Sequence, residues 1–410
     1  MDRARLLPLQ LPPASSINGY NGNIKGKVSF VKRLALGFIV LVGFGLLYVP
    51  AYHSAQRQIS GLGETMSPVR SVGGAHYLAS VAQLHGWGYN TTRDTCTYIR
   101  PENVTTILDP KYICSETPSP YLLIVVCSAV RNVNARLAIR NTWGNKSHLD
   151  ATYNSSVRLV FLLGQSDNDT LNSFVMDEGH LYNDIIQESF HDTYNNLTLK
   201  SVMLLKWAVA NCDKLTFLMK TDDDMFINVP ALVKALKGRS KVNGTLTGAL
   251  ICNARPITDP KNKWYTPKYM YSERTYPNYL SGTGYVMSLD VAHQLYKAAL
   301  STPVLHLEDV YVTGLCAKRA GVRPVNHYGF SYVPRKVDVC ALRETITAHK
   351  INPSTMHNIW NKLNDSAVMG QVCPSRSVPS ATKKTPVTGR FGKNIGLFLL
   401  RSRLLSNRCV

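Results

Sequence analysis

Short apolar runs alternate with amphipathic stretches between residues 121 and 221. The apolar runs are Tyr121–Val130, Val157–Gly164 and Lys214–Thr221. Their length and nearly continuous apolar character are typical of strands buried on both faces of a parallel sheet. The stretches between them, Asn132–Trp143 and Leu197–Cys212, place apolar residues at helical spacing. This order of strand, helix, strand, helix, strand predicts an α/β domain with a largely parallel sheet and right-handed crossovers.

One longer apolar run precedes this domain. The run "LALGFIVLVGFGLLYVPAY", Leu34 to Tyr52, carries no charge and is just long enough to cross a thin bilayer. Lys and Arg residues cluster before it, while only Arg57 follows closely, so the positive-inside rule predicts a cytosolic N-terminus. A cleaved signal peptide is the alternative, but the leader is long and no small-residue cleavage site follows. We therefore expect a signal anchor that holds a lumenal domain.

Glycosylation sequons and cysteines agree with a lumenal domain. Eight N-x-S/T sequons follow the apolar run and none precedes it: Asn90, Asn103, Asn145, Asn154, Asn168, Asn196, Asn243 and Asn364. Nine cysteines fit an oxidising compartment, and their spacing matches no C-x-x-C zinc pattern. Seven are disulfide candidates: Cys96, Cys114, Cys212, Cys252, Cys316, Cys340 and Cys373. Cys127 lies inside a predicted strand and fits a core thiol.

The chain is expected to divide into five parts. These are a cytosolic tail (1–33), a transmembrane anchor (34–52), a lumenal stem rich in Gly, Ser, Thr and Pro (53–118), a catalytic domain (119–373) and a basic tail without fixed structure (374–410). The formal charge of +20 is concentrated at the ends, since the two tails account for +13 of it. The remaining +7 contains no basic run, which argues against nucleic acid as a partner.

Three consecutive carboxylates stand directly behind the third predicted strand, in "KLTFLMKTDDDMFIN" (214–228). The negative charges of Asp222, Asp223 and Asp224 repel one another, so a fold that keeps the three together is expected to bind a cation beside them. In open α/β sheets, ligands bind outside the carboxyl ends of strands, where this triad is expected. Residues i and i+2 of an extended segment point to the same side, so Asp222 and Asp224 should face one ion. Oxygen ligands favour Mn²⁺ or Mg²⁺, and such an ion can bridge the phosphates of a ligand. Phe226 and Ile227 follow at once, which argues against a solvated turn.

Six ordered blocks give this pattern a family resemblance. They are "RLAIRNTWGN" (136–145), "KTDDDMFIN" (220–228), "KWYTPKYMY" (263–271), "YPNYLSGTGYVMS" (276–288), "LHLEDVYVTG" (305–314) and "ITAHKINPSTMHNIWN" (346–361). Over about residues 120 to 365, the chain resembles the β-1,3-galactosyltransferase family, glycosyltransferase family 31. The resemblance implies a GT-A fold, a Rossmann-like mixed and largely parallel sheet flanked by helices. It also implies a type II Golgi membrane enzyme.

The resemblance implies an inverting transfer from a UDP-sugar to a sugar hydroxyl. The leading expectation is galactose moved from UDP-galactose to the 3-hydroxyl of a terminal GlcNAc, GalNAc or Gal on a glycoprotein or glycolipid. N-acetylglucosamine from UDP-GlcNAc is the alternative donor sugar, because the motifs do not separate the two. A catalytically silent lumenal chaperone or lectin is a second alternative, and a metal-dependent nuclease conflicts with the sequons. Homo-oligomerisation is left open.

By this resemblance, the acid triad holds Mn²⁺ on the diphosphate of the donor. Asp222 and Asp224 would be metal ligands, with Asp224 the more direct one, and Asp223 would lie near the ribose or the sugar. His349 is a candidate for a further metal or diphosphate ligand, because a neutral imidazole suits Mn²⁺. The general base is assigned to Asp309, with Glu308 as its neighbour. Two adjacent carboxylates can raise one another's pKa toward a useful value.

Further residues are candidates for contacts with the donor. Arg136 and Arg140 are four residues apart on one helical face and are expected to reach the diphosphate or the uracil. Gly282 and Gly284 are expected to let the backbone approach the transferred sugar. Stacking on sugar rings is expected of three aromatic residues, Trp143, Trp264 and Tyr265.

The chain departs from the family pattern at one position. Family sequences commonly read E-D-V-Y-V-G, whereas here Thr313 is inserted before Gly314. The insertion leaves Asp309 in place but makes the register of the following helix uncertain.

Overall fold

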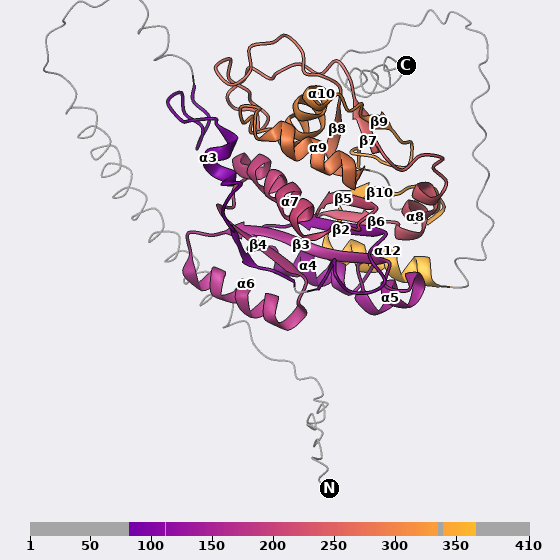
Figure 1. Ribbon diagram of the computed structural model, residues 1–410. Helices are drawn as coiled ribbons and strands as arrows, with labels where there is room; N and C mark the ends of the chain where they lie inside the picture. The colour runs from indigo at the N-terminus through magenta and orange to yellow at the C-terminus, as the bar shows by residue number, and fades with distance from the viewer. Residues whose placement is uncertain (1–81, 111, 335–338, 366–410) are drawn as a thin grey trace, which may run out of the picture. The chain divides into compact units, whose positions relative to one another are not determined.

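The computed structural model describes residues 82–110, 112–334 and 339–365 (Figure 1). The chain divides into two units, residues 1–78 and 79–410, and everything described lies in the second. The predicted anchor at residues 34–52, residues 53–81 of the predicted stem and the basic tail lie outside the described residues. No helix in the described part is long and apolar enough to cross a membrane.

A mixed sheet of eight strands forms the centre of the fold, in the order β1-β4-β3-β2-β5-β8-β7-β9 (Figure 1). Neighbouring strands β4, β3, β2 and β5 run parallel, whereas β8 is antiparallel to both β5 and β7. The strands of this sheet are β1 (Thr106–Leu108), β2 (Leu122–Cys127), β3 (Val157–Gln165), β4 (Ile185–His191), β5 (Phe217–Asp222), β7 (Leu246–Ile251), β8 (Tyr279–Ser288) and β9 (Val325–Asn326). The largely parallel α/β fold expected from the sequence is confirmed, and the three predicted strands correspond to β2, β3 and β5.

Helices cover both faces of this sheet. On one face lie α7 and α9, and on the other lie α4, α8 and α12 (Figure 1). The described helices are α3 (Thr95–Ile99), α4 (Val133–Arg140), α5 (Lys146–Tyr153), α6 (Asp169–Tyr182), η1 (Tyr194–Asn196), α7 (Leu197–Asn211), α8 (Val229–Lys237), α9 (Leu289–Ala299), η2 (Val310–Cys316), α10 (Ala317–Ala320), α11 (Val339–Glu344) and α12 (Pro353–Asn364). The two predicted helices correspond to α4 and α7.

Strand β2 shows why its sequence is apolar at every position. Leu123 and Val125 belong to the core beneath α7 and α9, while Ile124 and Val126 belong to the core beneath α4 and α12. Successive side chains of a strand point to opposite faces, so a central strand between two helical layers needs apolar residues throughout.

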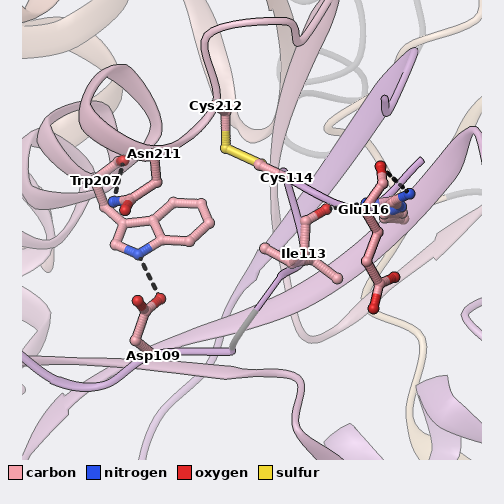
Figure 2. Close-up of a disulfide and its surroundings, with 8 residues drawn as sticks. Asp109, Ile113, Cys114, Glu116, Trp207, Asn211 and Cys212 are labelled. Carbon is pink, nitrogen blue, oxygen red and sulfur yellow. Dashed lines mark hydrogen bonds between the residues drawn. A yellow bond between two sulfur atoms is a disulfide. The ribbon is translucent and has the colours of Figure 1, made fainter. Parts of the chain in front are cut away.

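The segment before residue 119, which we assigned to the stem, contributes to the folded unit from residue 82 onward. Trp87 and Ile99 are buried in the core beneath α7, and β1 pairs with β4 at the edge of the sheet. A disulfide between Cys114 and Cys212 joins this segment to the end of α7 (Figure 2). Near it, the indole of Trp207 donates a hydrogen bond to Asp109 (Figure 2). Because this segment is mostly polar, its few large apolar residues do not show from the sequence alone that it packs into the core.

The cysteine predictions are confirmed in part. Cys114 and Cys212 are bonded to each other, and Cys252 and Cys340 are also disulfide-bonded. Cys127 is a buried thiol, as its place in β2 predicted. Two further candidates were wrong, because Cys96 and Cys316 are free thiols. Their sequence spacing could not distinguish a packed thiol from a bonded one.

Candidate active site

The acid triad lies where β5 turns back into β6 (Met225–Ile227). Asp222 is the last residue of β5, and Asp223 and Asp224 form the turn. Residues 217–221, which precede the triad in β5, are fully buried. The chain therefore turns only after it has passed through the core, at the edge of the sheet. Asp222 and Asp224 line one cavity, as their spacing predicted, and Asp223 does not.

A buried lysine neutralises the first acid of the triad. The ammonium group of Lys220 lies 2.7 Å from Asp222 Oδ1 and 3.4 Å from Glu308 Oε2, and it donates a 2.7 Å hydrogen bond to the Gly282 carbonyl. Its side chain is 3% exposed. The carboxylates of Asp222 and Glu308 hold the pKa of Lys220 well above its usual value, although burial opposes them. Lys220 is therefore charged and gathers two carboxylates on one wall of the cavity.

The second acid of the triad faces the carboxyl end of β2. Asp223 Oδ2 accepts hydrogen bonds from Ser128 (2.7 Å) and from the amide of Asn132 (2.9 Å). Burial raises the pKa of Asp223, and these two donors oppose the rise. Arg136 donates to the same Ser128 hydroxyl at 3.1 Å, so it supports Asp223 through one intervening side chain.

The third acid of the triad is brought beside His349 by a second, small sheet. Strand β6 pairs antiparallel with β10 (Thr347–His349), with His349 opposite Met225. His349 Nε2 consequently lies 3.4 Å from Asp224 Oδ2. The Nδ1 of His349 lies 2.8 Å from the Tyr332 carbonyl, which can only accept, so Nδ1 carries the proton. The hydrogen bond to Asp224 raises the pKa of His349, because the carboxylate favours the protonated ring; a cation beside Asp224 would instead be met by the Nε2 lone pair of the neutral ring.

Asp224 and His349 fit a divalent cation. Asp224 Oδ1 is buried and has no hydrogen-bond partner, an arrangement that a cation would relieve. The oxygen and imidazole ligands suit Mn²⁺, and a site with so few protein ligands leaves positions for phosphate oxygens and water. Within the described residues, no group of three His, Cys, Asp or Glu side chains is arranged to hold a metal alone. The predicted third ligand, Asp222, is engaged by Lys220 instead.

Asp309 lies across the same cavity, at the start of the π-helix η2. Its Oδ1 accepts from the Val310 amide at 2.9 Å, and its Oδ2 accepts from the Gly282 amide at 3.2 Å. A Cβ at residue 282 would lie 3.3 Å from the Asp309 Cβ, so glycine permits this approach of β8. Burial and the neighbouring charge of Glu308 raise the pKa of Asp309 to about 6. This is a suitable value for a group that must accept a proton near neutral pH.

Glu308 is placed differently from Asp309. It is 6% exposed, its Oε1 accepts a 2.6 Å hydrogen bond from the Tyr285 hydroxyl, and its Oε2 faces Lys220. Asp309, by contrast, is only partly buried. Asp309 is therefore the more accessible of the two carboxylates, whereas Glu308 is held between Tyr285 and Lys220.

The inserted Thr313 is accommodated by the π-helix. A π-helix takes up one extra residue without breaking the helix, and such turns are frequent at functional sites. The Thr313 hydroxyl donates to the Asp309 carbonyl at 2.6 Å and accepts from the Leu280 amide at 2.8 Å. The insertion thus ties the helix that carries Asp309 to β8.

Several predicted donor-binding residues are placed away from the cavity. Arg136 and Arg140 both bind Glu178, at 2.6 and 2.7 Å, and Arg140 also binds Asp184 at 2.8 Å. Neither guanidinium group lines the cavity, so their placement does not support the expected direct contact with the donor. An i,i+4 spacing marks a shared helix face but does not say whether that face meets a ligand or the sheet.

The candidate glycines and aromatic residues also differ in whether they line the cavity. Gly282 lines the cavity, whereas Gly284 packs beside Met219 and Thr221. Trp264 is 52% exposed at the cavity wall. Trp143 and Tyr265 are core residues whose polar atoms bond to the backbone at Met225 and Ala82.

The cavity has a volume of about 670 Å³, and it includes residues that sequence reasoning missed. These are Lys220, Tyr194, His306 and Tyr332. Lys220 stood within the quoted triad block, two residues before Asp222, and a buried lysine beside acids is a usable signal. A larger cavity of about 860 Å³, between α5, α8 and α12, has no carboxylate among its lining residues.

A mixed α/β sheet here brings an acid–histidine pair and a further carboxylate into one cavity. Comparison of sequences gives the family. The "Galactosyltransferase" family model matches residues 134–328. Beta-1,3-galactosyltransferase 1 of Mus musculus, like that of Homo sapiens, is 38% identical over 267 residues, which cover 65% of this chain and 80% of the relative. Human beta-1,3-galactosyltransferase 5 is 38% identical over 268 residues, or 84% of its length. The chain belongs to the galactosyltransferase family.

Among solved structures, one of the galactosyltransferase LgtC in complex with donor and acceptor sugar analogues is similar at 11% identity and a TM-score of 0.33. The alignment covers 59% of this chain and 96% of that one.

Proposed function

We propose that this protein transfers galactose from UDP-galactose to the 3-hydroxyl of a terminal GlcNAc, GalNAc or Gal, with inversion at the anomeric carbon. The observation that carries the proposal is that Asp309 and the Asp224–His349 pair line one cavity of about 670 Å³. A base and a site for a diphosphate-bound cation are the two groups that a direct displacement needs. The names of the relatives support galactose and the β-1,3 linkage.

In this mechanism, the ionised Asp309 accepts the proton of the acceptor hydroxyl as its oxygen attacks C1 of the sugar. The backbone amides of Gly282 and Val310 hold the carboxylate in place. Its raised pKa makes it a better proton acceptor while leaving it ionised at pH 7. Lys220 fixes the neighbouring Glu308, whose charge contributes to that pKa.

Asp224 and His349 would hold Mn²⁺ on the diphosphate, with Nδ1 of His349 anchored at the Tyr332 carbonyl. When bound, the metal would neutralise charge that develops on the departing UDP. Ser128 and Asn132 hold Asp223 away from the metal pair, and in this proposal Asp223 would lie near the ribose. Trp264 offers an exposed ring for stacking on a sugar.

The proposal includes a lumenal site of action in the Golgi, on a type II anchor at residues 34–52. The disulfide between Cys114 and Cys212 supports an oxidising compartment. The acceptor sugar would be carried by a glycoprotein or a glycolipid.

Donor screening tests the transferred sugar. Full-length protein in mild detergent would be supplied with MnCl₂, benzyl β-N-acetylglucosaminide and, in turn, radiolabelled UDP-galactose, UDP-GlcNAc, UDP-GalNAc and UDP-glucose. We expect UDP-galactose to label the acceptor and linkage analysis to give β-1,3. Transfer from UDP-GlcNAc alone would mean that the transferred sugar is N-acetylglucosamine and not galactose. Absence of transfer from every donor, also with benzyl β-N-acetylgalactosaminide and benzyl β-galactoside as acceptors and with UDP still bound, would support a silent relative.

A metal test uses the same assay. Removal of metal by EDTA followed by gel filtration should abolish transfer, and added Mn²⁺ should restore it. Asp224→Asn and His349→Ala should each weaken the binding of Mn²⁺–UDP, measured by calorimetry. Full turnover by the metal-free protein would contradict the role given to Asp224 and His349.

A further inference from the structure

His306 lies in the loop between α9 and η2, three residues before Asp309, and it lines the same cavity. Its side chain is 1% exposed. The carbonyl of the preceding residue, Leu305, accepts a hydrogen bond from the buried Thr198 hydroxyl, and this bond fixes the backbone before His306. The loop therefore holds the imidazole in place at the cavity wall.

Neither ring nitrogen of His306 makes a regular hydrogen bond, although the backbone of Tyr265 lies close enough to interact weakly with the ring. Among the side chains that the structure describes, His306 alone has two such atoms. A buried polar group without partners destabilises a fold, so each instance calls for a reason. The other unpartnered atom on this cavity, Asp224 Oδ1, has one in the proposed cation.

The environment of His306 limits what can bind it. Burial lowers its pKa to about 4, and a weaker interaction with the backbone of Tyr265 opposes this shift. The ring is therefore neutral near pH 7 and offers one N–H donor and one acceptor. A neutral ring carries no positive charge, so it is a poor partner for the negative charge of a phosphate group. A hydroxyl group, which both donates and accepts, matches a neutral imidazole.

We propose that His306 binds a hydroxyl group of a sugar in the cavity and thereby helps to determine which sugar the enzyme uses. The sugar is either the transferred hexose of the donor or the acceptor, since both must reach Asp309. This inference rests on the proposed function, because it takes the cavity to be the site of sugar transfer. It gives His306, two residues before the Glu308–Asp309 pair, a role in positioning the substrate.

Two variants of the full-length protein test the proposal. His306→Phe fills the same space without polar atoms, and His306→Gln retains a donor and an acceptor. UDP-galactose and benzyl β-N-acetylglucosaminide serve as the two substrates. For His306→Phe, we expect the KM of one of them to rise by about three- to tenfold, the effect of losing one hydrogen bond to a neutral group. His306→Gln should recover part of this loss.

The affinity for UDP and the thermal midpoint distinguish this role from a structural one. UDP binding should stay within about twofold of wild type, and the midpoint of His306→Phe should be equal or higher, because a buried unpartnered group is removed. A rise in the KM of UDP-galactose assigns the contact to the donor sugar, and a rise in that of the glucosaminide assigns it to the acceptor. If both KM values stay within about twofold of wild type, the proposal is overturned.

Failure of the proposed function would be recognised separately. In that case the wild-type protein transfers no sugar, and binding is measured instead. Calorimetry compares wild type with His306→Phe in two respects: the affinity for UDP-galactose relative to that for UDP, and the affinity for the glucosaminide. Equal binding by the two proteins overturns the role of His306. If His306→Phe does not fold, monodeoxy analogues of both sugars test the wild-type protein directly. One analogue should lose the same three- to tenfold, and no loss with any analogue contradicts the contact.

Discussion

The ammonium group of Lys220 lies 2.7 Å from a carboxylate oxygen of Asp222. Because the lysine is almost fully buried and also faces Glu308, its removal would leave two carboxylates with no compensating charge. We expect Lys220→Met to lower the free energy of unfolding by about 3–5 kcal/mol. Chemical denaturation measures this loss. The double variant Lys220→Met, Glu308→Gln should recover part of it, whereas equal stability of the two variants would argue against the pairing.

Replacement of Asp309 by asparagine should abolish transfer while leaving the binding of Mn²⁺–UDP intact. Asparagine keeps the shape of the side chain, and its one oxygen can still accept from either the Gly282 or the Val310 amide, but it cannot take up a proton. We expect kcat to fall by about 10²- to 10⁴-fold, the usual contribution of a general base. Initial rates and calorimetry provide the two measurements. An active Asp309→Asn protein would remove this residue from the mechanism.

The acidic limb of the pH–rate profile should report the ionisation of Asp309. Its pKa is raised to about 6, so kcat/KM should fall as the pH drops below this value and the base becomes protonated. Glu308→Gln removes the neighbouring negative charge that contributes to the shift. The limb should then move to lower pH, since ionisation of Asp309 becomes easier. An unchanged limb in this variant would mean that another group controls the rate.

Thr313→Val should weaken the support of Asp309 without changing the size of the side chain. The substitution removes the hydroxyl that donates to the Asp309 carbonyl and accepts from the Leu280 amide. A buried backbone group left without its partner costs about 1–3 kcal/mol. We expect a loss of that size in denaturant unfolding, together with a lower kcat. Thr313→Ser retains the hydroxyl and is the matched control, so equal losses in both variants would rule out the hydrogen bonds as the cause.

The disulfide between Cys114 and Cys212 should contribute strongly to stability. It closes a sequence separation of 98 residues and joins the segment before β2 to the end of α7. Replacing both cysteines by serine should cost about 2–5 kcal/mol. Thermal and denaturant unfolding measure this effect. Cys96→Ser, at a free thiol, should change little by comparison, and similar losses in both proteins would contradict the assignment.

Local patterns predicted the centre of the fold well. Strands β2, β3 and β5 and helices α4 and α7 followed from apolar periodicity, because a central strand must be apolar at every position. Residues from 82 onward, which the sequence assigns to the stem, pack with the folded unit, and periodicity gives no sign of this. The large apolar residues among them, such as Trp87 and Ile99, are isolated in a polar sequence, and only their burial beneath α7 reveals that they belong to the core.

The sequence by itself determined the chemical groups of the candidate site: three adjacent acids after a buried strand, the pair Glu308–Asp309, and His349. The tertiary structure decided what each group faces. Pairing of β6 with β10 sets His349 beside Asp224, and Lys220 forms an ion pair with Asp222. Arg136, which the sequence places at the donor, binds Glu178 instead. The tertiary structure also decided that His306 is buried without a regular hydrogen-bond partner. The physical reason is that periodicity specifies which side of an element is apolar, whereas contacts between distant segments depend on how those sides pack in three dimensions.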